Sequence, residues 1–162
     1  MHTSAEDSRA YMRLALEQAA QSAAIGEVPI GAVLVHEGTI LAQSHNHREA
    51  WQDPTAHAEL IVLRKGAKAL GRWRLLETTL FVTLEPCAMC LGGIILARVP
   101  RLVFAARDPK AGACGSVLDF ANNPRLNHRI EVVGGILEDE SQRMLSDFFK
   151  ELRAQQPDCR TS

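Results

Sequence analysis

The chain has 162 residues, 46% of them apolar and 23% charged, which suits a globular protein with a hydrophobic core of its own. No apolar run reaches the roughly 18 residues that a membrane-spanning helix requires, and residues 1–10 lack the apolar stretch of a secretory signal, so we expect a cytoplasmic protein that does not enter a membrane. The net charge of −1 argues against broad, salt-driven binding to nucleic acid.

Hydrophobic periodicity and turn residues predict the secondary structure. Apolar residues at helical spacing indicate amphipathic helices, whereas runs of β-branched and aromatic residues indicate strands. In chain order we predict a helix over residues 8–24, strands over 30–35 and 39–42, a helix over 57–70, a strand over 79–84, a helix over 87–97, a strand over 101–106, a Gly-rich loop over 108–116, a strand over 130–133 and a helix over 138–152. Strands that alternate with helices imply a three-layer α/β domain with parallel pairing where helices cross over.

Two short segments carry the residues that point to chemistry. The segment HAE begins at His57 and the segment PCAMC begins at Pro86, each at the start of a predicted helix. Cys87 and Cys90 are three residues apart and therefore share one face of a helix. Two thiolates and an imidazole are typical zinc ligands, and a helix N-terminus favours the thiolate form of cysteine. His57, Cys87 and Cys90 are therefore candidate zinc ligands.

The number of protein ligands distinguishes a catalytic zinc site from a structural one. A structural site has four, and this chain has no second C-x-x-C pair to complete such a set. Three ligands leave a position for water, whose pKa the metal lowers toward ~7. Glu59 follows His57 too closely to be a fourth ligand but is near enough to take a proton from that water. The pattern predicts metal-assisted hydrolysis with Glu59 as the catalytic proton shuttle.

These residues also have simpler interpretations. His57 could be a buried histidine, Glu59 a surface carboxylate, and Cys87 with Cys90 either core thiols or a thioredoxin-like redox pair. The Glu-Pro dipeptide before Cys87 and the upstream His-x-Glu disfavour the redox pair. For the other cysteines and histidines we expect no functional role. Cys114 and Cys159 are expected to be free thiols, and His36, His45 and His47 to be solvated side chains near turns.

The combination of H-x-E with P-C-x-x-C is the signature of zinc-dependent nucleobase deaminases. The chain resembles the cytidine/deoxycytidylate deaminase superfamily and, more narrowly, is similar to bacterial tRNA adenosine deaminases from about residue 11 to residue 152. The similarity is strongest in EVPIGAVLV (27–35), DPTAHAEL (53–60), TLEPCAMC (83–90), ARDPKAGACGS (106–116), NHR (127–129) and LSDFFK (145–150). The resemblance implies one α/β/α cytidine-deaminase-like domain over residues 1–162, with a mixed five-stranded sheet, one zinc ion per subunit and a polar tail after about residue 154.

The resemblance also implies a reaction. The substrate would be the wobble adenosine, position 34, of a tRNA anticodon stem-loop, converted to inosine. Zinc-bound hydroxide would attack C6 of adenine, while Glu59 protonates N1 and then the departing ammonia. An unpaired loop suits an enzyme that must take its base out of the stack. The family forms homodimers with a shared RNA site, and no binding to DNA is expected.

Substrate-binding residues follow from the same resemblance. Asn46 would hydrogen-bond the flipped nucleotide, and the backbones of Ala58 and Leu84 would make polar contacts in the pocket. Asp108 and Lys110 would touch the adjoining sugar–phosphate. The other implied substrate residues, which line the pocket or receive neighbouring nucleotides, are Val28, Glu85, Asn127, His128, Phe148, Phe149 and Arg153.

Several of these residues have a second interpretation. Asn46 could only shape a turn after the second strand, Glu85 could only set the backbone before the following proline, and Asp108 could close an Asx-type turn. Phe148 and Phe149 flank a helix face, so we expect one in the core and the other exposed for stacking.

Two rival functions remain open. The first is a deaminase of a free base or nucleoside, such as guanine or cytosine, and the second is a zinc-stapled RNA-binding or assembly module without catalytic activity. A small-molecule enzyme would not need the six basic and two acidic residues between Arg98 and Arg129, which could meet a short phosphate backbone or only form a solvated face. A structural module would have no use for Glu59.

Overall fold

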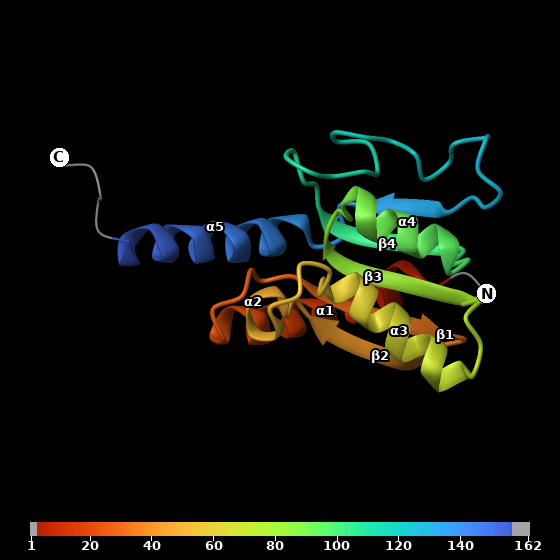
Figure 1. Cartoon of the computed structure of the whole chain (residues 1–162), viewed down its shortest axis with the longest axis horizontal. Coiled ribbons are helices and arrows are strands. Elements are labelled where there is room, and N and C mark those ends of the chain that lie inside the picture. The colour runs from red at the N-terminus through yellow and green to blue at the C-terminus, as the bar shows by residue number, and fades with distance from the viewer. Residues whose placement is uncertain (1–2, 157–162) are drawn as a thin grey trace.

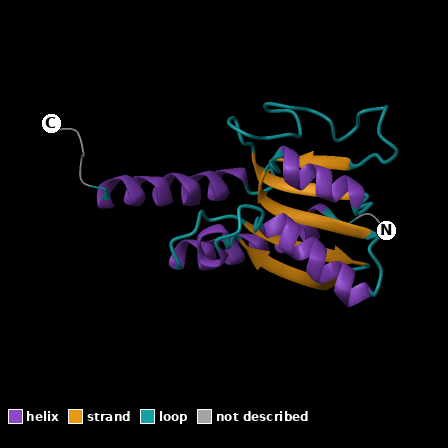
Figure 2. Ribbon diagram, in the orientation of Figure 1, coloured by secondary structure: helices purple, strands orange, loops and turns teal. Residues whose placement is uncertain are grey.

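The computed structural model describes residues 3–156, so Cys159 and the end of the predicted polar tail lie outside the described part of the chain. A single five-stranded sheet forms the centre, in the order β2-β1-β3-β4-β5 (Figure 2). Strand β1 is antiparallel to both of its neighbours, whereas β3, β4 and β5 run parallel, which confirms the predicted mixed sheet. The strands are β1 (Gly31–His36), β2 (Thr39–His45), β3 (Thr78–Leu84), β4 (Arg101–Ala106) and β5 (Glu131–Gly134).

Helices cover both faces of the sheet and complete the predicted three layers. Helices α3 and α4 lie over one face, and α1 lies over the other (Figure 1). Helix α5 begins on the α1 face and then runs outward beyond the sheet (Figure 1). The helices are α1 (Ala5–Ala24), α2 (Arg48–Trp51), α3 (Ala58–Leu70), α4 (Ala88–Leu96) and α5 (Glu138–Gln155).

Alternating side chains of the central strands fill a separate core on each face. In β3, Phe81 packs against α1, whereas Leu80 and Val82 pack under α3 and α4. Strand β4 repeats the pattern, with Val103 on the α1 side and Phe104 on the other. Because successive side chains of a strand point to opposite faces, continuously apolar strands are what a sheet covered on both sides requires.

Close packing of α1 on β1 depends on a glycine. A Cβ atom on Gly31 would overlap the backbone carbonyl oxygen of Ala15 and crowd the amide nitrogen of Ala19. The backbones of the helix and the strand can therefore approach here only because residue 31 has no side chain. This contact fixes the start of β1 just after the segment that contains Val28.

The structure differs from the sequence-based prediction at a few element ends. Helix α2 was not predicted, because four residues are too few to show helical periodicity. Strand β2 continues three residues further, to His45, and α1 begins earlier, at Ala5, behind a capping box of Ser4 and Asp7. Among residues 3–156, no helix is both long and apolar enough to cross a membrane.

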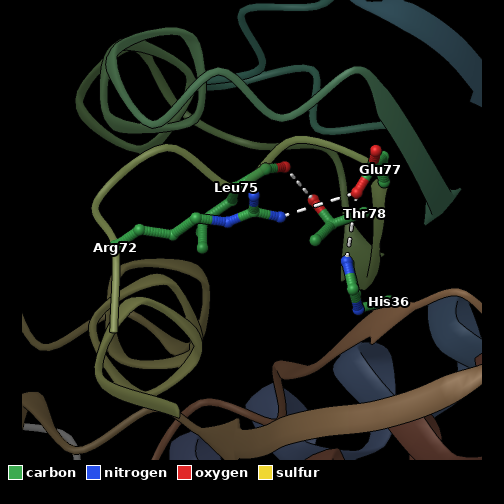
Figure 3. Close-up of polar contacts among 5 residues, drawn as sticks. All are labelled: His36, Arg72, Leu75, Glu77 and Thr78. Atoms are coloured by element: carbon green, nitrogen blue, oxygen red, sulfur yellow. Dashed lines mark hydrogen bonds and ion pairs between the residues drawn. The ribbon is translucent and has the colours of Figure 1, made fainter. Parts of the chain in front are cut away.

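A small polar cluster lies at the start of β3, at the end of the strand opposite Leu84. Glu77 Oε2 lies 3.4 Å from His36 Nε2 and 3.6 Å from an Arg72 guanidinium nitrogen (Figure 3). Thr78 Oγ1 donates a hydrogen bond of 2.6 Å to the carbonyl oxygen of Leu75 in the same turn (Figure 3). Because Glu77 and Arg72 are largely exposed, these ion pairs contribute little to stability.

Candidate active site

The three predicted metal ligands lie at the N-termini of the two helices on one face of the sheet. His57 is the N-cap residue of α3, and Cys87 is the N-cap residue of α4. Neither side chain hydrogen-bonds the backbone of its own helix, as most N-cap side chains do, so the imidazole and the thiol remain available as ligands. Cys90 follows Cys87 by one helical turn on the same face, as predicted.

The ligand atoms converge at distances that suit a single zinc ion. His57 Nδ1 lies 3.4 Å from Cys90 Sγ and 3.8 Å from Cys87 Sγ, and all three atoms lie within 4.8 Å of one another. Tetrahedral zinc with bonds of about 2.0–2.3 Å needs ligand atoms roughly 3.5–3.8 Å apart. Within residues 3–156 this is the group of three that could hold a metal ion, and its donors are those that zinc prefers.

The protonation of the cluster also fits a cation. The hydrogen bond from Cys90 and then the one from His57 lower the pKa of Cys87 to about 4, despite partial burial. The hydrogen bond with Cys87 raises the pKa of His57. The pKa of Cys90 is raised, first by its hydrogen bond to Cys87 and then by burial. The cluster thus holds one thiolate readily, and a divalent cation would supply the charge that stabilises a second.

Glu59 lies in the first turn of α3, and its side chain is almost entirely buried. The residue is 4% exposed, and its Oε2 atom has no hydrogen-bond partner within the described part of the chain. Burial raises the pKa of Glu59 to about 7. A buried carboxylate is costly to leave without a partner, so such an atom indicates a ligand, a water or a proton at this point. The position agrees with the predicted role as a proton shuttle.

Asn46 connects β2 to the start of α3. Its Oδ1 atom accepts a hydrogen bond of 3.0 Å from the backbone nitrogen of Ala58, and the residue is 2% exposed. The side chain therefore fixes the N-terminus of the helix that carries His57 and Glu59. The amide of Ala58, which was expected to contact substrate, is engaged by Asn46 in this structure.

Glu85 organises the loop that follows β4. Its carboxylate accepts hydrogen bonds from the backbone nitrogens of Asp108 (3.0 Å), Cys114 (2.9 Å) and Ser116 (3.1 Å), and from the hydroxyl of Ser116. Burial raises the pKa of Glu85, but these hydrogen bonds outweigh it, so the pKa lies below its ordinary value. A Cβ atom on Gly112 would collide with this carboxylate. The role of Glu85 is therefore to hold this loop in place, in addition to any effect on the backbone before Pro86.

The loop is also bonded directly to the metal-ligand segment. Cys87 forms an isolated antiparallel bridge with Gly112, and the nitrogen of Ala113 donates to the carbonyl oxygen of Pro86 at 2.9 Å. Asp108 Oδ1 accepts from the nitrogen of Lys110 at 2.9 Å, which is the Asx-type turn considered above. The exposed Lys110 is thereby held beside the candidate site.

Among the other predicted substrate residues, Val28 and Leu84 lie at this end of the sheet, and Phe148, Phe149 and Arg153 lie on α5. Asn127 and His128 precede β5 and lie at the opposite end of the sheet, because β5 runs parallel to β3 and β4 and begins beside Arg101. Val28 and Leu84 are half-buried. Asn127 is exposed, whereas the Nε2 atom of His128 lies 2.8 Å from the carbonyl oxygen of Val99. Arg153 is exposed on the outer part of α5.

The prediction that one of the two phenylalanines of α5 lies in the core is wrong. Phe148 is half-buried and Phe149 is 39% exposed, with their rings in edge contact at 5.4 Å. The physical reason is the position of the helix, because its second half runs beyond the sheet and no strand lies beneath it (Figure 1). Phe149 is the more exposed of the two and the better placed for stacking.

Sequence reasoning missed three features near the site. Ser116 bonds the loop after β4 to Glu85, and the buried Glu27 anchors α2, through contacts between residues far apart in sequence, for which no local pattern exists. His45 and His47, expected to be solvated, are instead half-buried and stack on each other, and Trp51 stacks on His47. Two histidines flanking an asparagine in the sequence HNH were the available signal for this cluster.

Comparison with known proteins agrees with this geometry. The MafB19-like deaminase family matches residues 6–153. The tRNA-specific adenosine deaminase of Bacillus subtilis (strain 168) is 52% identical over 143 residues, which cover 88% of this chain and 89% of that protein.

Solved structures of two deaminases are also similar to this chain. One from a study of A-to-I editing by tRNA:A34 deaminases at the wobble position of transfer RNA superimposes with a TM-score of 0.81 and 45% identity, covering 84% of this chain and 99% of the other. A guanine deaminase from Nitrosomonas europaea superimposes with a TM-score of 0.72 and 25% identity, covering 86% and 83% of the two chains. By fold, site and sequence, the chain belongs to the MafB19-like deaminase family and to the tRNA-specific adenosine deaminases.

Proposed function

We propose that this protein is a hydrolase that converts adenosine 34, the wobble nucleotide of a tRNA anticodon loop, into inosine. The observation that carries the proposal is the buried Glu59 carboxylate, whose Oε2 atom is free of protein partners within the described residues, beside three convergent metal ligands. The tRNA-specific adenosine deaminase of B. subtilis, 52% identical to this chain, supports the substrate class.

His57, Cys87 and Cys90 would hold one zinc ion, whose charge lowers the pKa of a water molecule and makes it a nucleophile near neutral pH. Three protein ligands are the number found in catalytic sites, and a structural module would bring four. The chain's own contribution is to order these ligands, through the two helix N-termini, before the substrate arrives.

Glu59 moves two protons during the reaction. It takes the first from water as the water oxygen bonds to C6 of adenine, and it gives this proton to N1. It then takes the proton of the new hydroxyl group at C6 and gives it to the amino group, so that the C6–N6 bond breaks and ammonia leaves. The product keeps the proton on N1 and a carbonyl group at C6, which is inosine. Burial of Glu59 keeps bulk water from competing for these protons.

The surroundings of Glu59 would bind the nucleotide and its neighbours. Asn46 is proposed to hold the flipped nucleotide while it fixes the start of α3, and the loop ordered by Glu85 would present Asp108 and Lys110 to the adjoining sugar–phosphate. The other proposed contacts are Val28, Ala58, Leu84, Asn127, His128, Phe148, Phe149 and Arg153. A homodimer in the cytoplasm, one deaminase domain per chain, would complete the assembly.

A deamination assay tests this proposal. The zinc-loaded protein is offered a stem-loop RNA with adenosine at the wobble position and, in parallel, free adenosine, cytidine, cytosine and guanine, and the products are identified by mass. Inosine formed only in the RNA is the expected result. Turnover of free guanine, with no product from the RNA, would favour the second candidate function, deamination of a free base. The similarity to the N. europaea guanine deaminase supports testing this alternative.

A further inference from the structure

A stack of three aromatic side chains lies beside the candidate site and has no part in the chemistry described above. The rings of His45 and His47 are 4.2 Å apart and inclined by 18°, and those of His47 and Trp51 are 4.3 Å apart and inclined by 23°. The stack extends from the end of β2 to α2, where Trp51 is 53% exposed. It therefore ends in an indole ring that is packed on one side and open to solvent.

Hydrogen bonds hold the stack in place. His47 Nδ1 lies 2.8 Å from the carbonyl oxygen of His45, and His45 Nδ1 lies 2.9 Å from that of Asn46. The short helix that carries Trp51 is anchored from a distant segment, because the buried Glu27 carboxylate accepts from the nitrogen of Ala50 at 2.8 Å. The rings are thus ordered before any ligand arrives, which reduces the entropy lost on binding.

The same segment is bonded to the catalytic helix. The backbone nitrogen of His47 donates to the carbonyl oxygen of Ala56 at 3.0 Å, and Asn46 Oδ1 accepts from the nitrogen of Ala58 at 3.0 Å. These two contacts flank His57, a proposed metal ligand. A base seated on Trp51 would therefore be held in a fixed position relative to the reacting atoms.

We propose that the His45–His47–Trp51 stack is a docking platform for an unpaired RNA base next to the target adenosine. The proposal rests on the proposed function, in which the substrate is a single-stranded loop. Unpaired bases bind proteins by stacking on aromatic rings, and a flat indole continues a column of stacked rings as another base would. The platform gives α2 a role in positioning substrate.

The surroundings of Trp51 favour a nucleobase over a second protein chain. The exposed residues next to it along the chain are the polar Arg48, Glu49 and Gln52 and the small Ala50. The core of a protein interface is depleted in charged residues and is built from a contiguous apolar patch. A single aromatic ring within a polar surface instead matches the way proteins receive individual bases.

Substitution of Trp51 tests the platform, and Trp73 provides the matched control. Trp73 is 56% exposed, in the turn before β3 at the far end of the sheet from Leu84. We expect Trp51→Ala to lower kcat/KM for the stem-loop RNA by about 5- to 100-fold, mainly through KM, and Trp51→Phe to retain most of the activity. Trp73→Ala is expected to stay within twofold of wild type.

Altered RNA identifies the bound base. An abasic nucleotide is placed on one side or the other of the target adenosine in two separate RNAs. We expect one of these RNAs to lower kcat/KM of the wild-type protein and to cause no further loss of kcat/KM in Trp51→Ala. Binding is followed separately with a double variant, Trp73→Phe with Glu59→Gln. The first substitution leaves Trp51 as the one tryptophan of the chain, and the second prevents turnover. RNA is expected to quench the fluorescence of Trp51 in this variant.

Three outcomes would overturn the proposal: wild-type kinetics for Trp51→Ala, equal effects of the abasic substitutions in both proteins, or Trp51 fluorescence unchanged by saturating RNA. Dissociation of a dimer by Trp51→Ala without RNA, together with indifference to abasic RNA, would assign the stack to contact with a second copy. Failure of the wild type to form inosine would count against the proposed function, whereas the quenching experiment would still decide whether the stack binds RNA.

Discussion

At the scale of single residues, the chemistry depends on groups whose surroundings differ sharply from water. Glu59 is buried and its Oε2 atom lacks a protein partner among residues 3–156, which costs stability unless a ligand, a water or a proton satisfies the carboxylate. Glu85 is equally buried, yet four hydrogen bonds satisfy its carboxylate. Two buried carboxylates thus differ in their surroundings: Glu85 holds a loop, whereas Glu59 is the proposed proton shuttle.

The first prediction concerns Glu59→Gln, which keeps the shape of the side chain but cannot carry a proton. We expect a loss of roughly 10²- to 10⁴-fold in the single-turnover rate on RNA, the usual contribution of a general acid–base group. The zinc content, measured by atomic emission, should equal that of wild type because the three proposed ligands are untouched. Activity within tenfold of wild type would remove Glu59 from the proposed mechanism.

The second prediction concerns Glu85→Gln. An amide cannot accept all the hydrogen bonds that the carboxylate receives, so some loop donors lose their partner, at about 1–3 kcal/mol for each buried donor. We expect faster tryptic cleavage at Arg107 and Lys110 and a KM for RNA that rises more than kcat falls. Glu131→Gln, at a half-exposed carboxylate beside Arg101, is the matched control and should alter neither.

At the scale of elements, the site depends on where helices begin and on how closely they pack. Residues 57 and 87 are N-caps, so the positive ends of α3 and α4 both point at the proposed ligands and favour thiolates there. The close contact between α1 and β1, allowed by Gly31, positions the strand that pairs with β3, and the Cys87 segment follows β3.

The third prediction tests that contact with Gly31→Ala. The added methyl group would overlap the backbone at Ala15, which cannot move without shifting α1, so we expect a loss of at least about 1–3 kcal/mol in the free energy of unfolding. The control is Gly92→Ala in α4, where a Cβ meets no atom within 4 Å and the better helix propensity should stabilise by up to about 1 kcal/mol. Urea unfolding measures both, and equal stability of the two variants would contradict the packing argument.

The fourth prediction concerns the anchor of α2. Glu27→Ala removes the carboxylate that accepts from the nitrogen of Ala50, and loss of such a cap costs about 0.5–2 kcal/mol. We expect faster hydrogen exchange at Ala50 and Trp51, with the core strands protected as before. Unchanged exchange at these two amides would show that α2 is held by its stacked rings alone.

At the scale of the whole molecule, one metal ion would tie together two helices that are 30 residues apart in sequence. Ligand binding to the folded state alone stabilises it by mass action, about 2.7–4.1 kcal/mol at 100–1,000 times the dissociation constant. The fifth prediction is therefore a rise in the melting temperature when zinc is added to chelator-treated protein. Cys90→Ser should abolish the rise, whereas Cys114→Ser, outside the proposed ligand set, should preserve it. An identical response in both variants would locate the metal elsewhere.

The sequence by itself determined the layers and the candidate site residues. Continuously apolar runs in β3 and β4 require a sheet covered on both faces, because each strand must bury side chains on two sides. The spacing of Cys87 and Cys90, with Glu59 two residues after His57, predicted candidate ligands and a candidate proton shuttle, because local spacing on a helix fixes which side chains share a face.

Only the tertiary structure decided how distant segments support that site. The bonds from Glu85 to Cys114 and Ser116 span 29 and 31 residues, and the bond from Glu27 to Ala50 spans 23. The exposure of Phe149 follows from the outward course of α5 (Figure 1). Periodicity reports only which face of an element is apolar, so it says nothing about contacts between elements that depend on how the chain is folded in three dimensions.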